Sequence, residues 1–296
     1  MLKIAVSSRS LFHIEDGDRI FREEGASAFD AYMQEKEDIP LRPGSAFHLI
    51  RKLLKLNEAG GERLVEVVML SRNSPSASLR VMNSVQHYGL DIEKAAFTSG
   101  RDRFGFAKAF DVQLFLSANA DDARAALQKG IASAIMVPTE ASDSEESSVT
   151  VAFDGDSVIF SDEADKVYRE LGLSGFRDHE VRNATVPLKP GPFFPVLQEL
   201  HRIQSNPGAR EHLRISVVTA RGAPAHARVL HSFRHLGVAA DEVVFCGGAP
   251  KGPLLKAAKA DIFFDDTQKN IGSAVESGIA SGHVPFGEGG ITREAA

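Results

Sequence analysis

Two pairs of aspartates stand out in the second half of the sequence, because each pair directly follows a short run of apolar residues. Asp154 and Asp156 form one pair, and Asp265 and Asp266 form the other. If the fold brings the pairs together, four carboxylates cannot all be ionised in one place without a cation. Mg²⁺ is the natural candidate, because it prefers one or two carboxylates together with phosphate and water oxygens. We therefore predict that all four aspartates form a magnesium site.

Two further side chains in this half follow apolar runs and could bind a phosphoryl group. Thr219 offers a hydroxyl and Lys251 an ammonium, both suited to the oxygens of a phosphate ester. Gly155, between the first two aspartates, has no Cβ and would let the backbone approach a phosphate closely. Together with Ala220 and Arg221, it completes the substrate-binding set that we predict for this half.

The apolar runs that precede these residues are predicted to be buried β-strands. Unbroken stretches of Val, Ile and Phe are typical of parallel strands covered on both faces, and ligands bind beyond the carboxyl ends of such strands. Amphipathic helical patterns lie between them, for example over residues 44–56 and 191–204. The predicted strands are Lys3–Ser7, Val65–Leu70, Ala95–Thr98 and Gln113–Ser117, then Val149–Phe153, Ile215–Thr219, Val243–Cys246 and Asp261–Phe264.

The two halves of the chain are related by an internal duplication. A shift of 147 positions aligns Ala5–Leu56 with Ala152–Ile203 without a gap, and 14 of the 52 pairs are identical. We therefore predict an α/β protein of two tandem Rossmann-like halves, each with a parallel sheet flanked by helices. Residues 1–138 would form the first half, 139–148 a polar linker and 149–296 the catalytic half.

The first half has lost the acids that define the second. Ser7 and Arg9 stand where the second half has Asp154 and Asp156, so a former cation site would become an anion site. Three roles stay open for it: binding the substrate as a cap domain would, forming a separate nucleotide effector pocket, or only burying surface. The residues that would bind a nucleotide are Ser7, Ser8, Arg9, Ser71, Arg72 and Asn73.

Composition excludes several other classes of function. A formal charge of −6 without clustered Lys and Arg argues against a nucleic-acid partner. The single Cys246 excludes an internal disulfide framework. The longest apolar stretches, such as Ile131–Pro138, are far shorter than the roughly 18 residues that a membrane span needs. We expect a cytoplasmic protein with no membrane partner.

The order of these motifs resembles the haloacid dehalogenase superfamily of phosphohydrolases. Nearly the whole chain is similar to the cytosolic 5′-nucleotidase type I family, which implies a haloacid dehalogenase-like fold, Mg²⁺-dependent hydrolysis of nucleoside 5′-monophosphates, AMP prominently, and a homo-oligomer in the cytosol. The similar segments are Phe153–Glu163, Val218–Arg221, Gly248–Leu255 and Phe263–Asp266, with Ile4–Arg9, Leu70–Pro75, His87–Ile92 and Leu114–Asn119 in the first half.

The resemblance also implies individual roles. Asp154 would attack phosphorus to form an aspartyl-phosphate, and Asp156 would act as general acid and then base. Asp154, the main-chain carbonyl of Asp156 and Asp265 would bind Mg²⁺, with Asp266 next to them. Two alternatives remain: a phosphatase of the same superfamily for another small phosphate ester, and a nucleotide-binding regulatory protein whose hydrolysis is vestigial.

Overall fold

The computed structural model describes residues 1–139 and 148–287. The predicted linker therefore lies outside the described residues, except for Thr139 and Ser148. The strands of the first half are β1 (Leu2–Val6), β4 (Val65–Ser71), β5 (Lys94–Phe97), β6 (Leu114–Ser117) and β7 (Ala132–Val137), with a short pair β2 (Phe12–His13) and β3 (Arg42–Pro43). Those of the second are β8 (Val149–Phe153), β9 (Leu213–Thr219), β10 (Glu242–Phe245), β11 (Ile262–Asp265) and β12 (Ala280–His283).

Both halves have the same topology. The strand order is β5-β4-β1-β6-β7 in the first half and β10-β9-β8-β11-β12 in the second, and every pairing within each of these two sets of five strands is parallel. The short pair β2 and β3 is antiparallel. This confirms the predicted α/β fold with a mostly parallel sheet. Each of the eight predicted strands is present, with ends that differ by at most two residues.

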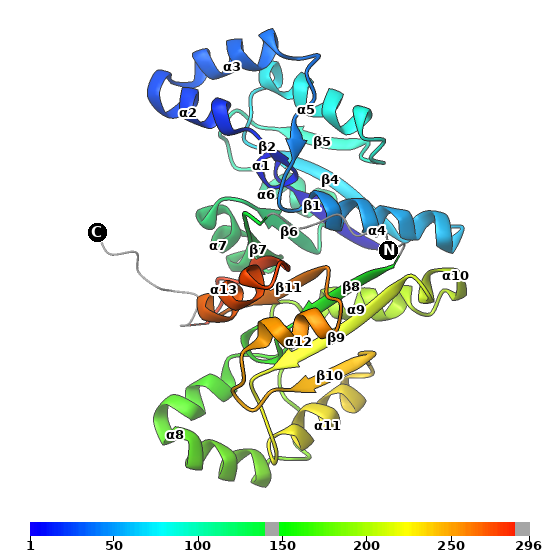
Figure 1. The fold of residues 1–296 in the computed structure, drawn as a ribbon, viewed down its shortest axis with the longest axis vertical. Coiled ribbons are helices and arrows are strands. Elements are labelled where there is room, and N and C mark those ends of the chain that lie inside the picture. The colour runs from blue at the N-terminus through cyan, green and yellow to red at the C-terminus, as the bar shows by residue number, and fades with distance from the viewer. Residues whose placement is uncertain (140–147, 288–296) are drawn as a thin grey trace.

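The two sheets that the sequence suggested are in fact one ten-stranded sheet (Figure 1). Strands β7 and β12, which the sequence analysis did not identify, pair in antiparallel fashion and join the halves edge to edge. Gly282 of β12 makes the close packing here possible, because a Cβ at this position would lie 2.7 Å from the Phe264 ring and 2.9 Å from the Ala134 Cβ. Pairing the two edges satisfies backbone groups that would otherwise be exposed.

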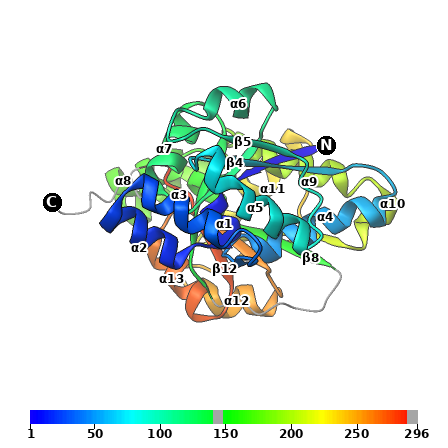
Figure 2. The ribbon, with the colours of Figure 1, turned by 90° about the horizontal axis from the view of Figure 1, so that it is seen from above.

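Helices cover both faces of the sheet (Figures 1 and 2). Alternate residues of the strands enter different cores: Ile4 and Val6 of β1 belong to one core that spans both halves, whereas Ala5 belongs to a second core on the other face. The first half contains α1 (Ser8–Leu11), α2 (Glu15–Glu24), α3 (Ala26–Glu35), α4 (Phe47–Gly60), α5 (Pro75–His87), α6 (Phe104–Ala109) and α7 (Ala120–Gln128).

The second half repeats this arrangement of helices. It contains a short turn η1 (Gly155–Ile159), then α8 (Glu163–Arg182), α9 (Phe194–Ile203), α10 (Pro207–Arg210), α11 (His226–Leu236), α12 (Lys251–Ala257) and α13 (Gln268–Glu276). Helix α8 lies at one end of the long axis of the molecule, and α2 and α3 lie at the other (Figure 1). Across residues 1–139 and 148–287, we find no helix with the length and apolar character needed to traverse a bilayer.

Candidate active site

The acids meet because β8 and β11 are neighbours in the sheet. Phe153 and Phe264 are register partners in parallel strands, so Asp154 and Asp265, the next residue in each case, leave the sheet side by side. Asp154 is 7% exposed and Asp265 is fully buried. The carboxyl ends of these strands thus bring together two of the carboxylates that the sequence placed there.

Lys251 lies between these two carboxylates. Its Nζ is 2.8 Å from Asp154 Oδ1 and 2.7 Å from Asp265 Oδ2, at the first residue of α12. Burial disfavours the charged ammonium, but Asp154 and Asp265 outweigh this effect and raise the pKa of Lys251. The lysine therefore stays charged and holds the two acids in place.

Asp266 completes a cluster that fits a divalent cation. One carboxylate oxygen from each of Asp154, Asp265 and Asp266 lies within 4.8 Å of the others. Burial, with repulsion from Asp154 and Asp265, raises the pKa of Asp266 to about 8. Burial also raises the pKa of Asp154 to about 8 against the opposing effect of Lys251. Three buried carboxylates with only one cationic side chain between them leave an excess of negative charge, and their oxygens are hard ligands that suit a divalent cation.

Thr267, Asn270 and His283, which were not predicted as site residues, make hydrogen bonds to Asp265 and Asp266. Asp265 accepts hydrogen bonds from the Thr267 backbone N–H at 2.7 Å and from Asn270 Nδ2 at 3.1 and 3.2 Å. His283 Nε2 lies 2.9 Å from the carbonyl oxygen of Asp266. Asn270 aligns with Asp122 in the internal duplication. The change from Asp122 in the first half to Asn270 in the second is the sequence signal that could have pointed to Asn270.

Gly155 and Thr219 line the space next to Asp154. Thr219 is the last residue of β9 and is 1% exposed, and a Cβ on Gly155 would lie 3.2 Å from its Oγ1. The glycine thus keeps the approach to the threonine hydroxyl open. Ala220, the next residue of the predicted binding set, is exposed.

The carboxylate of Asp156 faces Arg221 rather than the cluster of acids. Arg221 donates to it from Nε and Nη2, both at 2.8 Å, and also pairs with the buried Glu180. Only Asp154, Asp265 and Asp266 form a group with metal-ligand spacing in the part of the chain that the structure describes. Arg221, predicted to bind substrate, is 4% exposed and engaged by two carboxylates.

Comparisons with known proteins give the family. A family model described as 5′-nucleotidase matches residues 1–290. The chain belongs to the 5′-nucleotidase family. It is 35% identical over 291 residues to human cytosolic 5′-nucleotidase 1B, an alignment that covers 94% of this chain and 48% of the relative. The chain thus spans about half the length of that relative. No solved structure matches significantly.

The first half of the chain keeps the fold of the site but has different charged residues at the equivalent positions. Ser7 Oγ contacts Ser10 Oγ and Ser8 Oγ contacts Ser71 Oγ, both at 2.9 Å. Arg9 donates from Nε to Asp18 at 2.6 Å. Asn73 donates its backbone N–H to Ser71 Oγ at 3.1 Å. In the described chain, no hydrogen bond or ion pair joins these residues to the four aspartates of the second half.

Two arginines of the first half share one carboxylate. Arg72, predicted to bind nucleotide, and the buried Arg103 both form ion pairs with Asp122. Arg103 aligns with Lys251, so a cation remains at this position. Arg72, Arg103 and Asp122 together carry a net positive charge, and an anion-binding role for the first half stays a prediction.

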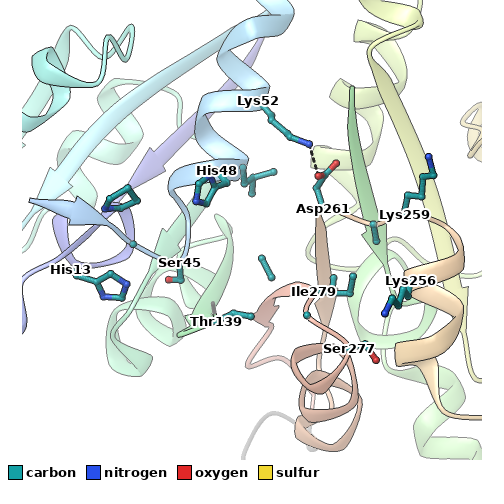
Figure 3. Close-up of a pocket in the computed structure, with 16 residues that line it drawn as sticks. His13, Ser45, His48, Lys52, Thr139, Lys256, Lys259, Asp261, Ser277 and Ile279 are labelled. Carbon is teal, nitrogen blue, oxygen red and sulfur yellow. Dashed lines mark hydrogen bonds and ion pairs between the residues drawn. The ribbon is translucent and has the colours of Figure 1, made fainter. Parts of the chain in front are cut away.

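A separate cavity of about 560 Å³ lies between the two halves of the chain (Figure 3). Its lining includes His13, His48 and Lys52 from the first half and Lys256 and Lys259 from the second; the acid that lines it, Asp261, is 2.6 Å from Lys52. Asp261, in the lining of the cavity, lies directly before β11, and Asp265 is the last residue of that strand. At about 3.3 Å per residue along a strand, the two aspartates are about 13 Å apart, so the cavity is distinct from the cluster of acids.

Proposed function

We propose that this protein hydrolyses nucleoside 5′-monophosphates, AMP among them, to a nucleoside and phosphate. The observation that carries the proposal is the position of Lys251, 2.8 Å from Asp154 and 2.7 Å from Asp265, with Asp266 completing the cluster. Membership of the 5′-nucleotidase family and the name of the human relative support the same reaction.

Asp154 would be the nucleophile. Lys251 Nζ and the Gly155 N–H both contact its Oδ1, which leaves Oδ2 for in-line attack on phosphorus. The attack would form an aspartyl-phosphate and divide one difficult displacement into two easier steps. Thr219 and Lys251 would bind the non-bridging oxygens of the phosphoryl group, where donors stabilise the charge of the transition state.

Asp156 would transfer the protons. It would protonate the 5′-oxygen of the leaving ribose and then deprotonate the water that hydrolyses the aspartyl-phosphate. Asp154, Asp265 and the main-chain carbonyl of Asp156, with Asp266 beside them, would hold Mg²⁺. When bound, Mg²⁺ would supply positive charge to the phosphoryl oxygens.

Phosphate release from a panel of substrates tests this proposal. We expect hydrolysis of AMP and other nucleoside 5′-monophosphates that stops on chelation and returns with Mg²⁺, with little hydrolysis of sugar phosphates. Preference for a sugar phosphate would instead favour the alternative phosphatase. Binding of nucleotide without release of phosphate would favour a regulatory protein whose hydrolysis is vestigial.

The role of the first half is a second part of the proposal. Its substrate-binding role rests on Ser7, Ser8, Arg9, Ser71, Arg72 and Asn73, which gather at strand ends. An effector role is favoured by the cavity between the halves, because five basic side chains surround a volume suited to a phosphorylated ligand. A cytoplasmic location and a homo-oligomer stay predictions; the human relative is named as cytosolic.

A further inference from the structure

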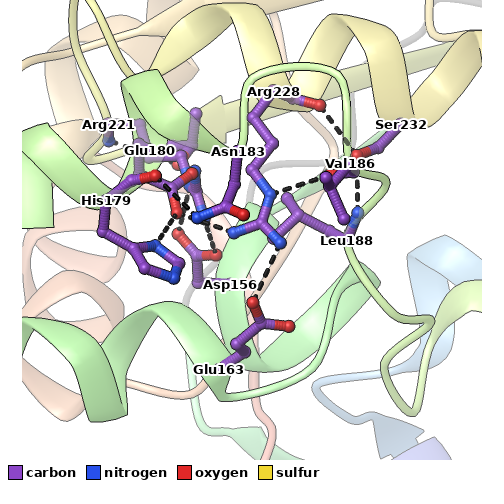
Figure 4. A network of polar contacts seen from close by, with 11 residues as sticks. Asp156, Glu163, His179, Glu180, Asn183, Val186, Leu188, Arg221, Arg228 and Ser232 are labelled. Carbon is purple, nitrogen blue, oxygen red and sulfur yellow. Dashed lines mark hydrogen bonds and ion pairs between the residues drawn. The ribbon is translucent and has the colours of Figure 1, made fainter.

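A buried chain of ion pairs lies behind Asp156 (Figure 4). Arg221 binds Asp156 on one side and Glu180 on the other. Glu180, near the end of α8, also accepts a hydrogen bond from Arg228 Nη1 at 2.8 Å. Arg228 in turn pairs with Glu163, at the beginning of α8, at 2.9 Å. Helix α8 is therefore connected to the side chain that we propose as the general acid.

The centre of this network is almost completely removed from water. Glu180 is 0% exposed, and the side chains of Arg221 and Arg228 are each 2% exposed. Burial opposes ionisation of Glu180, but Arg221 and Arg228 outweigh it and lower the pKa of that carboxyl. The Arg221 guanidinium also lies over the ring of Phe176, 5.5 Å from its centroid. Buried charges are costly and often contribute no net stability, so their presence calls for another explanation.

The first half shows which parts of the network the fold itself needs. Arg80 aligns with Arg228, and their Nε atoms donate to the carbonyls of Ile39 and Val186, both at 2.9 Å. The equivalent serines that follow them, Ser84 and Ser232, also make matching bonds, each donating at 2.7 Å to the carbonyl of its own arginine. These shared contacts hold the loop that precedes α4 in the first half and the loop that precedes α9 in the second.

The charges that face Arg221 are absent from the first half. Glu180 aligns with Met33, whose Sδ lies 3.9 Å from Arg80 Nη1. Arg221 aligns with Asn73 and Asp156 with Arg9. The first half thus packs Met33 where the second half has the buried carboxylate of Glu180. Glu180 occurs in the half that also has Asp156, the side chain that Arg221 binds.

We propose that Glu180 is a positioning residue, which fixes Arg221 so that Arg221 sets the position of the Asp156 side chain through its two hydrogen bonds. The inference rests on the proposed function. In the first step a bond forms between an Asp154 oxygen and phosphorus and the bond from phosphorus to the ribose 5′-oxygen breaks. That oxygen takes up a proton from Asp156, which must be in its protonated form when the substrate is bound. A carboxylate misplaced by about 1 Å can slow such a step about 10²-fold.

Two substrates with different leaving groups test this role. The variants are Glu180→Met, which copies the first half, and Glu180→Gln, which keeps the shape and removes the charge. We expect rapid-quench formation of the phosphoenzyme from AMP to slow about 10- to 100-fold in both variants. The p-nitrophenolate burst from p-nitrophenyl phosphate should slow less than about threefold, because that leaving group departs without a proton.

A matched control is Glu163→Gln, which removes the outer partner of Arg228 and leaves Glu180 in place. Its rates should stay close to wild type with both substrates. If the rates with AMP and with p-nitrophenyl phosphate fall equally, Glu180 has only a structural role. If the rates of both Glu180 variants equal those of the wild type, Glu180 has no role in the reaction. Either result overturns the inference. If Glu180→Met does not fold, Glu180→Gln decides. A wild-type protein that does not release phosphate from AMP would instead overturn the proposed function on which the inference rests.

Discussion

Lys251 and Arg103 occupy equivalent positions in the two halves, but they neutralise different acids. Each is a buried cation at the start of a helix, α12 and α6 respectively. Lys251 lies between Asp154 and Asp265, whereas Arg103 pairs with Asp122, which aligns with Asn270. The carboxylate has thus moved from the strand end to the following helix. In the second half this leaves an excess of negative charge that a cation can satisfy, and in the first half an excess of positive charge.

Replacing the proposed nucleophile should abolish turnover without unfolding the protein. In Asp154→Asn the carboxamide is nearly isosteric but a poor nucleophile, so phosphate release from AMP should fall by roughly 10³-fold or more. Thermal melting below pH 8 should show little loss of stability in the absence of Mg²⁺, because burial raises the pKa of Asp154 to about 8 and the carboxamide then replaces a largely uncharged group of nearly the same shape. Activity near that of the wild type would contradict the assignment.

Removing the buried lysine should cost both stability and activity. Lys251→Met leaves Asp154 and Asp265 without their shared cation, and the loss of one partner from a buried ion pair typically costs about 3 to 5 kcal/mol. The folded enzyme should also lose about 10²- to 10³-fold in kcat. Arg103→Met is the matched control: urea unfolding should show a loss of stability, while kcat of the folded enzyme is retained. Equal effects on kcat in the two variants would contradict a catalytic role for Lys251.

The stability of the cation-free protein should fall as pH rises from about 4 to 8. Asp154 and Asp266 have folded-state pKa values of about 8, above the ordinary value of 3.8, so the folded protein binds more protons than the unfolded chain in this range. Mg²⁺ competes with these protons, so the increase in Tm on adding Mg²⁺ should be larger at pH 8 than at pH 6. Asp266→Asn should reduce both effects. A Tm increase independent of pH would argue against cation binding at these acids.

A methyl group at position 155 should impair catalysis while the fold persists. In Gly155→Ala the new Cβ would lie 3.2 Å from Thr219 Oγ1, so either the hydroxyl or the turn after β8 must shift. We expect kcat for AMP to fall roughly tenfold, because Thr219 would no longer be aligned with the phosphoryl oxygens. The first half has Ser8 at this position, which shows that the backbone there accepts a side chain. Unchanged kinetics would exclude a close approach of phosphate to Gly155.

Two variants separate the possible roles of the first half. Lys256→Glu reverses a charge in the cavity between the halves and should weaken any activation or inhibition by added nucleotides, with an unchanged KM for AMP in their absence. Arg9→Ala should raise KM for AMP with little change in kcat if the strand ends of the first half bind substrate. If neither variant changes KM or the response to nucleotides, the first half only buries surface.

Much of the fold was predictable because its signals are local. Val149–Phe153 was identified with its observed ends, because an unbroken apolar run bounded by polar residues is typical of a strand buried on both faces. The equivalence of the halves was visible in the duplication alone. Strands β7 and β12 were missed. Strand β7 lies within the apolar stretch Ile131–Pro138, but the pairing of β7 with β12, which is so far away in the sequence, leaves no local signal.

The sequence by itself determined which residue types stand at the strand ends: acids, a threonine and a lysine in one half, and serines and arginines in the other. Only the tertiary structure decided how their charges pair. It placed Lys251 between Asp154 and Asp265, turned the Asp156 carboxylate toward Arg221, and engaged Arg9 and Arg72 with Asp18 and Asp122. The reason is that an ion pair depends on distance and burial, and these partners, which are 9 to 97 positions apart in the sequence, come together only when the sheet and its helices pack.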